Sequence, residues 1–431
     1  MRLTLAYGKD GLEIEVPDAN VAGVLDLRPV EAVPDPEAAV REALRRPIGT
    51  RPLRELAEGR RDAVIVVCDV TRPVPNPVIL PPMLDELNAA GIPDGAITVL
   101  IATGTHRPND EPELRRMLGE AVLARCRVVN HHCDRPEDMV ALGTSPNGVP
   151  IALNRHYVNA DVRLTVGMIE PHFMAGFAGG RKMVMPGVAA IETVQAWHSP
   201  AFLEHPCAHN GSVEGNPVHD EATWIANQCR PDLIVDVALT RSREIARVFA
   251  GDMEAAWNAG VAFVRTLVEA PYAPPIDICI TTCGGFPLDL TYYQTVKGVV
   301  GAAPAVRPGG TVIVASACDE GIGNAHFREA LHRVGDISTW LERAISGEWE
   351  RVPDQWQIEE LAKGVREHHV TLVTRGIPAE EFPYLHVHVA PSVEAALAEA
   401  FARHGEAARV LVVPKGPYVL PVAQRVPERD R

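Results

Sequence analysis

Continuous apolar runs, each followed by a polar cluster, recur along the first half of the chain. The runs Ala63 to Cys68, Ala96 to Ala102 and Val162 to Met168 have the composition of strands that are covered on both faces of a sheet. Strand, polar cluster and helix form the repeating unit of a parallel α/β sheet. We expect further strands at Arg127 to Asn130 and Leu233 to Leu239, and helices at Asp35 to Arg45, Ala189 to His198, Asp220 to Cys229 and Met253 to Glu269.

A proline-rich stretch, Ala270 to Pro275, divides the pattern in two. We expect an N-terminal α/β domain at residues 1–272, which opens with a hairpin of Arg2 to Tyr7 and Leu12 to Val16. A smaller α/β domain is expected at residues 276–405, and a tail at 406–431 for which a return to the first domain is one option. The predicted fold class is therefore α/β, two domains with a cleft between them. The second domain is expected to have strands at Ile276 to Thr281, Thr311 to Ser316, His369 to Thr374 and Leu385 to Val389, and helices from Leu290 to Val300, Phe327 to Val334, Ile358 to Arg366 and Val393 to His404. A last strand, Ala408 to Val413, is expected in the tail.

Composition and charge narrow the class of partner. The 431 residues carry a formal net charge of -15, which argues against nucleic acid or an anionic membrane as a partner, while a local basic pocket for a small acid stays compatible with it. The sequence has no run of 18 apolar residues and no signal-peptide pattern, so we expect a cytoplasmic protein. The eight cysteines include no CxxC pair and are expected to be reduced. Nothing in the sequence indicates an oligomeric state.

Polar side chains follow three of the predicted strands directly. Asp69 and Arg72 come after the first strand, His106 after the second, and His172 after the run that ends at Met168. Ligands of open α/β sheets bind beyond the carboxyl ends of the strands. We therefore expect these four side chains to converge in one crevice.

The stretch from Glu170 to Pro200 concentrates candidate chemistry. Gly179 and Gly180 leave room for an anionic ligand to approach backbone amides, although the turn matches neither the Walker nor the GxGxxG spacing, and a flexible turn between strand and helix is the alternative. Lys182 follows them. Only five of the 41 basic residues are lysines, so a lysine here is expected to use its primary amine, which can be acylated or form an imine.

Seven motifs stand along the chain, namely DVTRP at Asp69 to Pro73, Thr105-His106-Arg107, Glu170-Pro171-His172, Gly179-Gly180-Arg181-Lys182, His198, Gln294 with Lys297, and PKG near the C-terminus. Taken together, these motifs resemble the nickel-dependent lactate racemase family over nearly the whole chain. No single motif decides this, but their order and spacing agree with the family pattern.

The resemblance implies a nickel pincer nucleotide, a pyridinium-3-thioamide-5-thiocarboxylic acid mononucleotide that holds nickel. Lys182 matches the lysine that is joined covalently to this cofactor, and Gly179 and Gly180 would lie beside it. His198 matches the protein ligand of nickel, since imidazole with soft sulfur suits a square-planar metal. The cofactor implies assembly enzymes as partners.

The resemblance also implies the reaction, racemisation or epimerisation of a 2-hydroxy acid by proton-coupled hydride transfer. His106 and His172 match the two acid/base histidines on opposite faces of the substrate. Four further residues are expected to bind substrate or cofactor without a settled division of roles, namely Arg72 and Lys297 for a carboxylate or phosphate, with Asp69 and Gln294 as polar neighbours. We expect Tyr293 to contact the substrate, and the residues that choose the acid to come from Phe173, Met174, Tyr292, Tyr293 and Trp356.

Several alternatives remain at this stage. Each histidine alone could be structural, His198 could cap helix carbonyls, and Arg72 could be the ion-pair partner of Asp69. A nicotinamide-dependent dehydrogenase would need a GxGxxG that the chain lacks. A non-catalytic carrier of a nickel nucleotide or small acid would not need both His106 and His172. A zinc site within Pro200 to Asp220 lacks regular ligand spacing.

Overall fold

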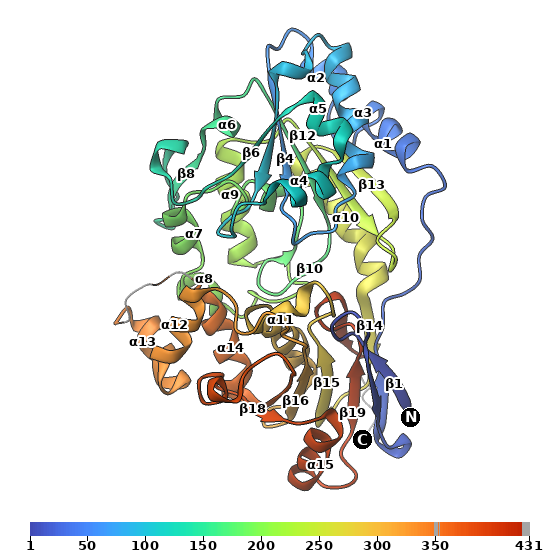
Figure 1. Cartoon of the computed structure of the whole chain (residues 1–431), viewed down its shortest axis with the longest axis vertical. Coiled ribbons are helices and arrows are strands. Elements are labelled where there is room, and N and C mark those ends of the chain that lie inside the picture. The colour runs from blue at the N-terminus through green and yellow to red at the C-terminus, as the bar shows by residue number, and fades with distance from the viewer. Residues whose placement is uncertain (349–351, 353, 425–431) are drawn as a thin grey trace, which may run out of the picture.

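The protein has two α/β halves, each built on a six-stranded sheet (Figure 1). The computed structural model describes residues 1–348, 352 and 354–424. In the first sheet the strand order is β13-β12-β9-β4-β5-β6, parallel except for β13. Its strands are β4 (Ala63–Cys68), β5 (Ile97–Ala102), β6 (Arg127–Asn130), β9 (Val162–Met168), β12 (Leu233–Leu239) and β13 (Ile245–Gly251).

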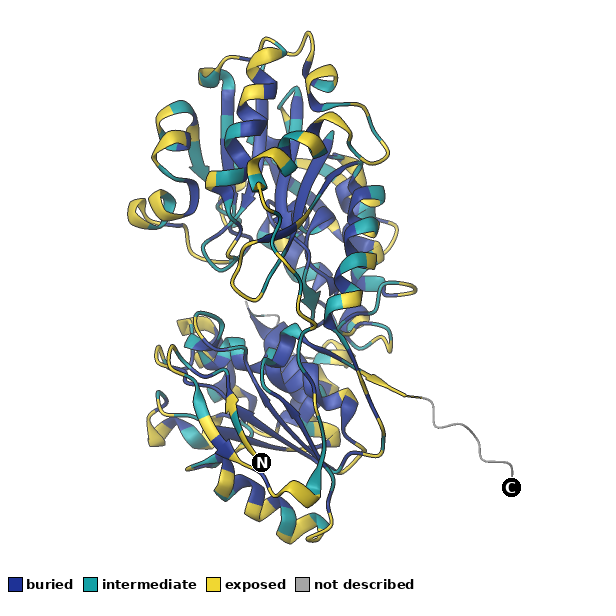
Figure 2. Ribbon diagram, turned by 90° about the vertical axis from the view of Figure 1, so that its right-hand side faces the viewer, coloured by how far each residue is buried: buried dark blue, intermediate teal, exposed yellow. Residues whose placement is uncertain are grey.

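Alternate side chains of the central strands point into two separate cores. In β4, Ile65 and Val67 pack with α1 and α3, while Val64 and Val66 pack on the opposite side with α9 and α10. This double burial is why the strand is apolar without interruption. Figure 2 shows the buried strands at the centre of each half, with exposed positions on the outer helices. The helices of this half are α1 (Pro36–Arg45), α2 (Leu53–Ala57), α3 (Asn76–Ala89), α4 (Glu111–Leu118), α5 (Glu120–Arg125), α6 (Arg155–Val158), α7 (Ile191–Trp197), α8 (Pro200–Leu203), α9 (Pro217–Gln228) and α10 (Met253–Val268).

The second sheet is parallel throughout, in the order β18-β17-β16-β15-β19-β3. One face packs with α11 and α14, and the other with α15 and the N-terminal hairpin. Its strands are β15 (Ile278–Thr282), β16 (Thr311–Ala315), β17 (His369–Val373), β18 (His388–Ala390), β19 (Val410–Val413) and β3 (Val21–Val24), and its helices are α11 (Tyr292–Ala302), α12 (Ala325–Val334), α13 (Ile337–Ser346), α14 (Gln355–Glu367) and α15 (Val393–His404).

Both ends of the chain differ from the expected domain ranges. The hairpin β1 (Arg2–Leu5) and β2 (Leu12–Glu15) forms as predicted, but its apolar side packs on the second sheet, and β3 pairs with β19. The tail contributes β19 to that same sheet before η8 (Gly416–Tyr418) reaches β10 (Pro171–His172) of the first half. Pairing between segments some 390 residues apart has no local signature, so the sequence pattern could not assign them.

Two further segments differ from the prediction. The proline-rich stretch expected as a linker begins as β14 (Glu269–Tyr272), which pairs with β20 (Leu420–Ala423) in a two-stranded sheet where proline is tolerated. The strand expected from Leu385 to Val389 is wrong at its start. Residues Ala379–Tyr384 form the 3-10 helix η7, and β18 begins only at His388. The Leu385 side chain is buried, and its carbonyl accepts a hydrogen bond from Tyr292, so its apolar character serves helix packing.

Two findings bear on the expected environment of the chain. All eight cysteines are free. In the part of the chain that the structure describes, no helix combines the length and the apolar character needed to cross a membrane.

Candidate active site

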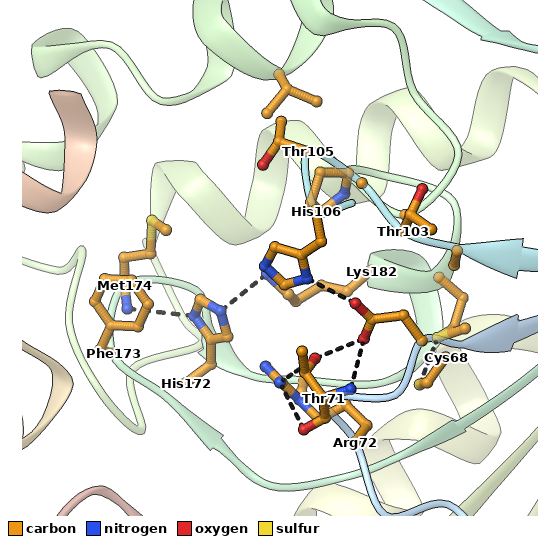
Figure 3. A pocket seen from close by; sticks show the side chains of 18 of the residues that line it. Cys68, Thr71, Arg72, Thr103, Thr105, His106, His172, Phe173, Met174 and Lys182 are labelled. Carbon is orange, nitrogen blue, oxygen red and sulfur yellow. Dashed lines mark hydrogen bonds and ion pairs between the residues drawn. The ribbon is translucent and has the colours of Figure 1, made fainter. Parts of the chain in front are cut away.

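The polar clusters that follow β4, β5 and β9 converge, as expected, on one cavity of about 160 Å³. Residues of the second half, from α11 and α14, close its other side. Figure 3 shows His106, His172, Lys182 and Arg72 gathered around the same space. Of the predicted site residues, those that line the cavity are Asp69, Arg72, His106, His172, Gly179, Lys182, His198, Tyr293 and Lys297.

His106 is oriented by a carboxylate. Its Nδ1 lies 2.7 Å from Asp69 Oδ2, while Asp69 Oδ1 accepts a hydrogen bond of 2.5 Å from the Thr71 hydroxyl. Burial raises the pKa of Asp69, but His106, Thr71 and Arg72 outweigh it and hold that pKa below its usual value. The ionised carboxylate therefore accepts a hydrogen bond from the N–H at Nδ1, and Nε2 of His106 is left as the basic nitrogen. The ring is 40% exposed, so it can exchange protons with water.

His172 lies deeper, in the short strand pair of β10 with β11 (Gly176–Phe177). The amide of Ala175 donates to its Nδ1 over 3.3 Å, so Nε2 carries the hydrogen and faces Lys182 Nζ at 3.1 Å. The ring stacks on Phe173 with centroids 4.8 Å apart. Burial and the cations Lys182 and Lys297 hold the pKa of His172 well below its usual value. The ring is consequently neutral near pH 7.

Lys182 lies in the 3-10 turn η4 (Gly180–Met183), with Nζ 5.2 Å from the centre of the Trp197 ring. Burial, followed by the charges of Arg181, Arg72 and Lys297, holds the pKa of this amine well below its usual value. A depressed pKa favours the neutral amine, which is the nucleophilic form. The site thus presents a lysine that is suited to acylation.

The two glycines before Lys182 serve packing as well as access. Gly179 and Gly180 have φ values of 78° and 54°. A Cβ at Gly179 would lie 2.7 Å from Asp236 Oδ2, and one at Gly180 would lie 2.8 Å from the Trp257 ring. The Gly180 amide donates to Asp236 over 2.7 Å. Gly180 does not line the cavity, so its amide is not directed at a ligand there.

At the end of α7, one ring nitrogen of His198 makes a hydrogen bond and the other stays available. Its Nδ1 donates to the Val194 carbonyl over 2.9 Å, as in the capping alternative, and its ring stacks on Trp356 with centroids 4.5 Å apart. Burial and the charge of Lys182 lower the pKa of His198 to about 3. The neutral ring therefore carries a lone pair on Nε2, the form in which imidazole binds a metal.

Comparison with known proteins identifies the family. The model of the lactate racemase N-terminal domain matches residues 7–211, and that of the lactate racemase C-terminal domain matches residues 272–420. The chain belongs to the lactate racemase family. This family is nickel-dependent, and its curated members that match here are isomerases.

Relatives cover nearly the whole chain. The lactate racemase of Lactiplantibacillus plantarum is 36% identical over 417 residues, which are 96% of this chain and 98% of the relative. That of Thermoanaerobacterium thermosaccharolyticum is 36% identical over 375 residues, 86% of this chain and 88% of the relative. The structure of the lactate racemase apoprotein from T. thermosaccharolyticum matches with a TM-score of 0.91 at 34% identity, covering 98% and 100% of the two chains. A Thermotoga maritima protein shares the fold, with a TM-score of 0.69 at 19% identity over 90% and 99%.

Two cationic residues, Arg72 and Lys297, line the cavity. Arg72 Nε lies 2.8 Å from Glu170 Oε1, so Glu170 is its ion-pair partner and Asp69 pairs with His106 instead. Lys297 Nζ lies 5.7 Å from the centre of the Phe173 ring. Burial and the charge of Arg72 lower the pKa of Lys297 to about 8. Both cations face the cavity and can receive an anion.

The other expected pocket residues divide in two. Phe173, Met174, Tyr293 and Trp356 line the cavity, and Trp356 Nε1 donates to the Tyr293 hydroxyl over 3.1 Å. Tyr292 does not line it, because its hydroxyl donates to Leu385 in the core of the second half. Gln294 does not line it either. Its Oε1 is buried without a hydrogen-bond partner among the described residues.

Sequence reasoning missed Asp236, the residue that holds the Lys182 turn. It lies in β12, accepts from the Gly180 amide, and has no solvent exposure. Burial raises the pKa of its carboxyl to about 7. The signal was available, since an aspartate within the apolar run Leu233 to Leu239 is costly unless it has a partner.

No cluster of three or more histidine, cysteine or acidic side chains in the described residues could hold a metal ion by itself. The residues His205, Cys207, His209 and His219 therefore do not form the zinc site that was considered. His219 instead stacks on Trp257, with ring centroids 5.0 Å apart. A metal in the cavity would depend on donors that a bound cofactor brings.

Proposed function

We propose that the chain racemises or epimerises a small 2-hydroxy acid, lactate or a close relative, with a nickel pincer nucleotide attached through Lys182. The observation that carries the proposal is the joint presence, around one cavity, of two histidines suited to proton transfer, a lysine whose pKa is depressed and a histidine with a spare Nε2 lone pair. A carrier of the same cofactor would not need the Asp69–His106 pair.

The residues present fit the cofactor. The depressed pKa of Lys182 favours the neutral amine, which is the nucleophile that an acyl or thioacyl attachment requires. His198 offers a single nitrogen ligand, which is consistent with a metal whose other donors come from the cofactor. When bound, the nickel pincer nucleotide supplies a two-electron acceptor for the α-hydrogen of the substrate.

The chain's own residues handle the substrate's charge and its hydroxyl proton. Arg72 and Lys297 are the cations available for the carboxylate, and Glu170 fixes the Arg72 guanidinium through Nε. His106 accepts the hydroxyl proton of one enantiomer at Nε2, with Asp69 stabilising the imidazolium that forms. His172, whose hydrogen lies on Nε2, would serve the mirror-image hydroxyl as the proton donor, after the ring has taken up a second proton. The proton that His106 accepts returns to water through its exposed ring, so each turnover balances.

The lining of the cavity bears on the charge and the substituent of the substrate. Its apolar wall includes Phe173, Met174 and Trp356, and Arg72, the only arginine that lines it among the residues the structure describes, already has a carboxylate partner. A second substrate carboxylate would have no free arginine there. We therefore favour a monocarboxylate with a small apolar substituent over a dicarboxylate.

The test is a panel of single-enantiomer 2-hydroxy acids incubated with protein co-produced with cofactor-assembly enzymes, with products separated by chiral chromatography. Lactate or a near relative should racemise. His106→Ala and His172→Ala should each lower turnover about 100-fold or more and keep the cofactor adduct, since proton transfer contributes 10²–10⁴-fold. His388→Ala, an exposed histidine paired with Glu399 on the far edge of the second sheet, is the matched control. A cofactor-loaded protein that racemises no acid in the panel would contradict the proposal and favour a carrier.

A further inference from the structure

A second cavity, of about 230 Å³, lies between the two halves of the molecule and is larger than the active-site cavity. Its walls come from the connector after β3, the β12–β13 turn, the end of α10 and the segment around Lys415. Figure 1 shows α10 descending from the first half toward β14 at this junction. Met168 is the only lining residue that it shares with the active site. The two cavities are neighbours, since Arg72 of the active site pairs with Glu170 of this cavity, but their linings differ.

The floor of this cavity is apolar. Leu27, Val30, Ile169, Leu239 and Leu267 contribute aliphatic side chains from both halves of the molecule. No reaction proposed above uses these side chains. Enclosed apolar surface of this kind favours the body of an organic ligand over water.

The rim of the cavity is cationic, through Arg28, Arg241, Arg243 and Lys415. Arg241 and Lys415 share a single acid, Asp26, at 3.1 and 3.6 Å. Arg28 has no hydrogen bond or ion pair from its side chain within the described residues. In a chain of net charge -15, four cations around one hollow with two acids nearby, Asp26 and Glu170, are a local exception.

Arg243 adds a conformational observation. It has a φ of 66°, in the left-handed region that non-glycine residues seldom adopt, within the turn closed by the hydrogen bond from Thr240 to Glu244. Its guanidinium donates to the Phe286 carbonyl over 3.1 Å and has no acidic partner among the described residues. The only acid lining the cavity, Glu170, is already paired with Arg72. Positive charge at the rim is thus left for an external anion.

We propose that this cavity is a second ligand site, which binds a small amphipathic monoanion. The apolar body lies against the aliphatic floor, and its carboxylate, sulfonate or phosphate lies between the rim arginines. A three-carbon 2-hydroxy acid lacks the apolar body and is not the ligand of this site. The site is independent of the cofactor, because neither Lys182 nor His198 lines it.

Binding is measured by fluorescence titration of the full-length protein with 8-anilinonaphthalene-1-sulfonate, an amphipathic sulfonate. Octanoate should displace the probe, while lactate should not, and octanol should compete at least about tenfold more weakly than octanoate because it lacks the charge. Displacement by lactate at the same concentration as octanoate would overturn the proposal.

Four variants locate the probe. Arg28→Glu and Arg243→Glu should each weaken binding about tenfold, since each turns an attractive charge into a repulsive one. Arg60→Glu, the same change on an exposed residue just before β4 and hence at the opposite end of the first sheet, should leave it unchanged. Lys297→Ala should also leave it unchanged, because Lys297 lines the active-site cavity and does not line this one. Equal affinity in both rim variants and wild type, or loss of binding in Lys297→Ala, would overturn the assignment.

Discussion

Neighbouring acceptors set the tautomers of the two histidines that matter most for this chemistry. Asp69 accepts a hydrogen bond from Nδ1 of His106, and the Val194 carbonyl accepts one from Nδ1 of His198. Each ring is left with Nε2 as its basic nitrogen. The two acceptors affect the protonated ring differently. An ionised carboxylate stabilises an imidazolium, whereas a carbonyl at the end of a helix does so much less. His106 is therefore suited to proton transfer and His198 to metal binding.

The role of Asp69 gives the first prediction. Asp69→Asn keeps the size of the side chain but removes the charge that stabilises protonated His106, so turnover should fall about 100-fold. Cofactor content should stay the same, because Lys182 and His198 are untouched. Racemisation rates normalised to nickel content measure the effect. Asp161→Asn, which removes a carboxylate paired with exposed Arg61, is the control, and a rate for Asp69→Asn within twofold of that control would show that His106 does not need its partner.

At this scale the sequence indicated most of the cavity's chemistry but not its arrangement. His106, His172 and Lys182 follow predictable strand ends or stand in a distinctive motif, so their candidacy was accessible. The pairing of Arg72 with Glu170, in contrast, depends on contacts between segments about 100 residues apart. No local pattern encodes such a contact.

At the scale of elements, the turn that carries Lys182 depends on close packing of its backbone. Gly180 lies against Trp257 of α10 and donates its amide to Asp236 of β12. Two elements of the first half thus fix the position of the neighbouring lysine.

Replacement of this glycine is the second prediction. Gly180→Ala should destabilise the protein by about 2–4 kcal/mol, because a left-handed residue gains a Cβ that also collides with Trp257. Gly59→Ala is a matched control. Its φ of 74° imposes similar strain, but nothing lies within 4 Å of the added Cβ, so it should cost only about 1 kcal/mol. Chemical denaturation compares the two, and equal losses would mean that packing at Gly180 is unimportant.

Strands that are buried on both faces were predictable to within a residue. Ala63–Cys68, Val162–Met168 and Leu233–Leu239 have the expected bounds, because double burial leaves an uninterrupted apolar run. Val21–Val24 was missed. It is a short edge strand whose residues are partly exposed, and its pairing partner lies at the other end of the chain. The sequence of these four residues alone therefore does not indicate a strand.

At the scale of the whole molecule, the first residues of the chain complete the core of the second half. Leu5 and Ile14 of the hairpin are buried against Ile278, Ile313 and other side chains of the second sheet. The active-site cavity also draws on both halves. The stability of the catalytic cleft therefore depends on a segment that lies far from it in sequence.

Truncation in this hairpin is the third prediction. Leu5→Ala, at a fully buried position, should lower the free energy of unfolding by about 2–5 kcal/mol through lost burial and an unfilled cavity. Leu3→Ala, at a partly exposed position of the same strand, should cost distinctly less. Urea unfolding followed by tryptophan fluorescence measures the loss, because tryptophans of both halves, among them buried Trp197 and Trp340, report on the transition. Similar losses in both variants would contradict the packing described here.

The central claim is that Lys182 carries a nickel-bearing nucleotide, and intact-mass spectrometry with nickel analysis tests it most directly. Protein co-produced with the cofactor-assembly enzymes should show one added mass and about one nickel per chain, as expected from one Lys182 and one His198. Lys182→Ala should show no added mass, while Lys9→Ala, a lysine beside Phe286 outside the active-site cavity, should keep it. An adduct that persists in Lys182→Ala, or wild-type protein that gains neither mass nor nickel, would contradict the account.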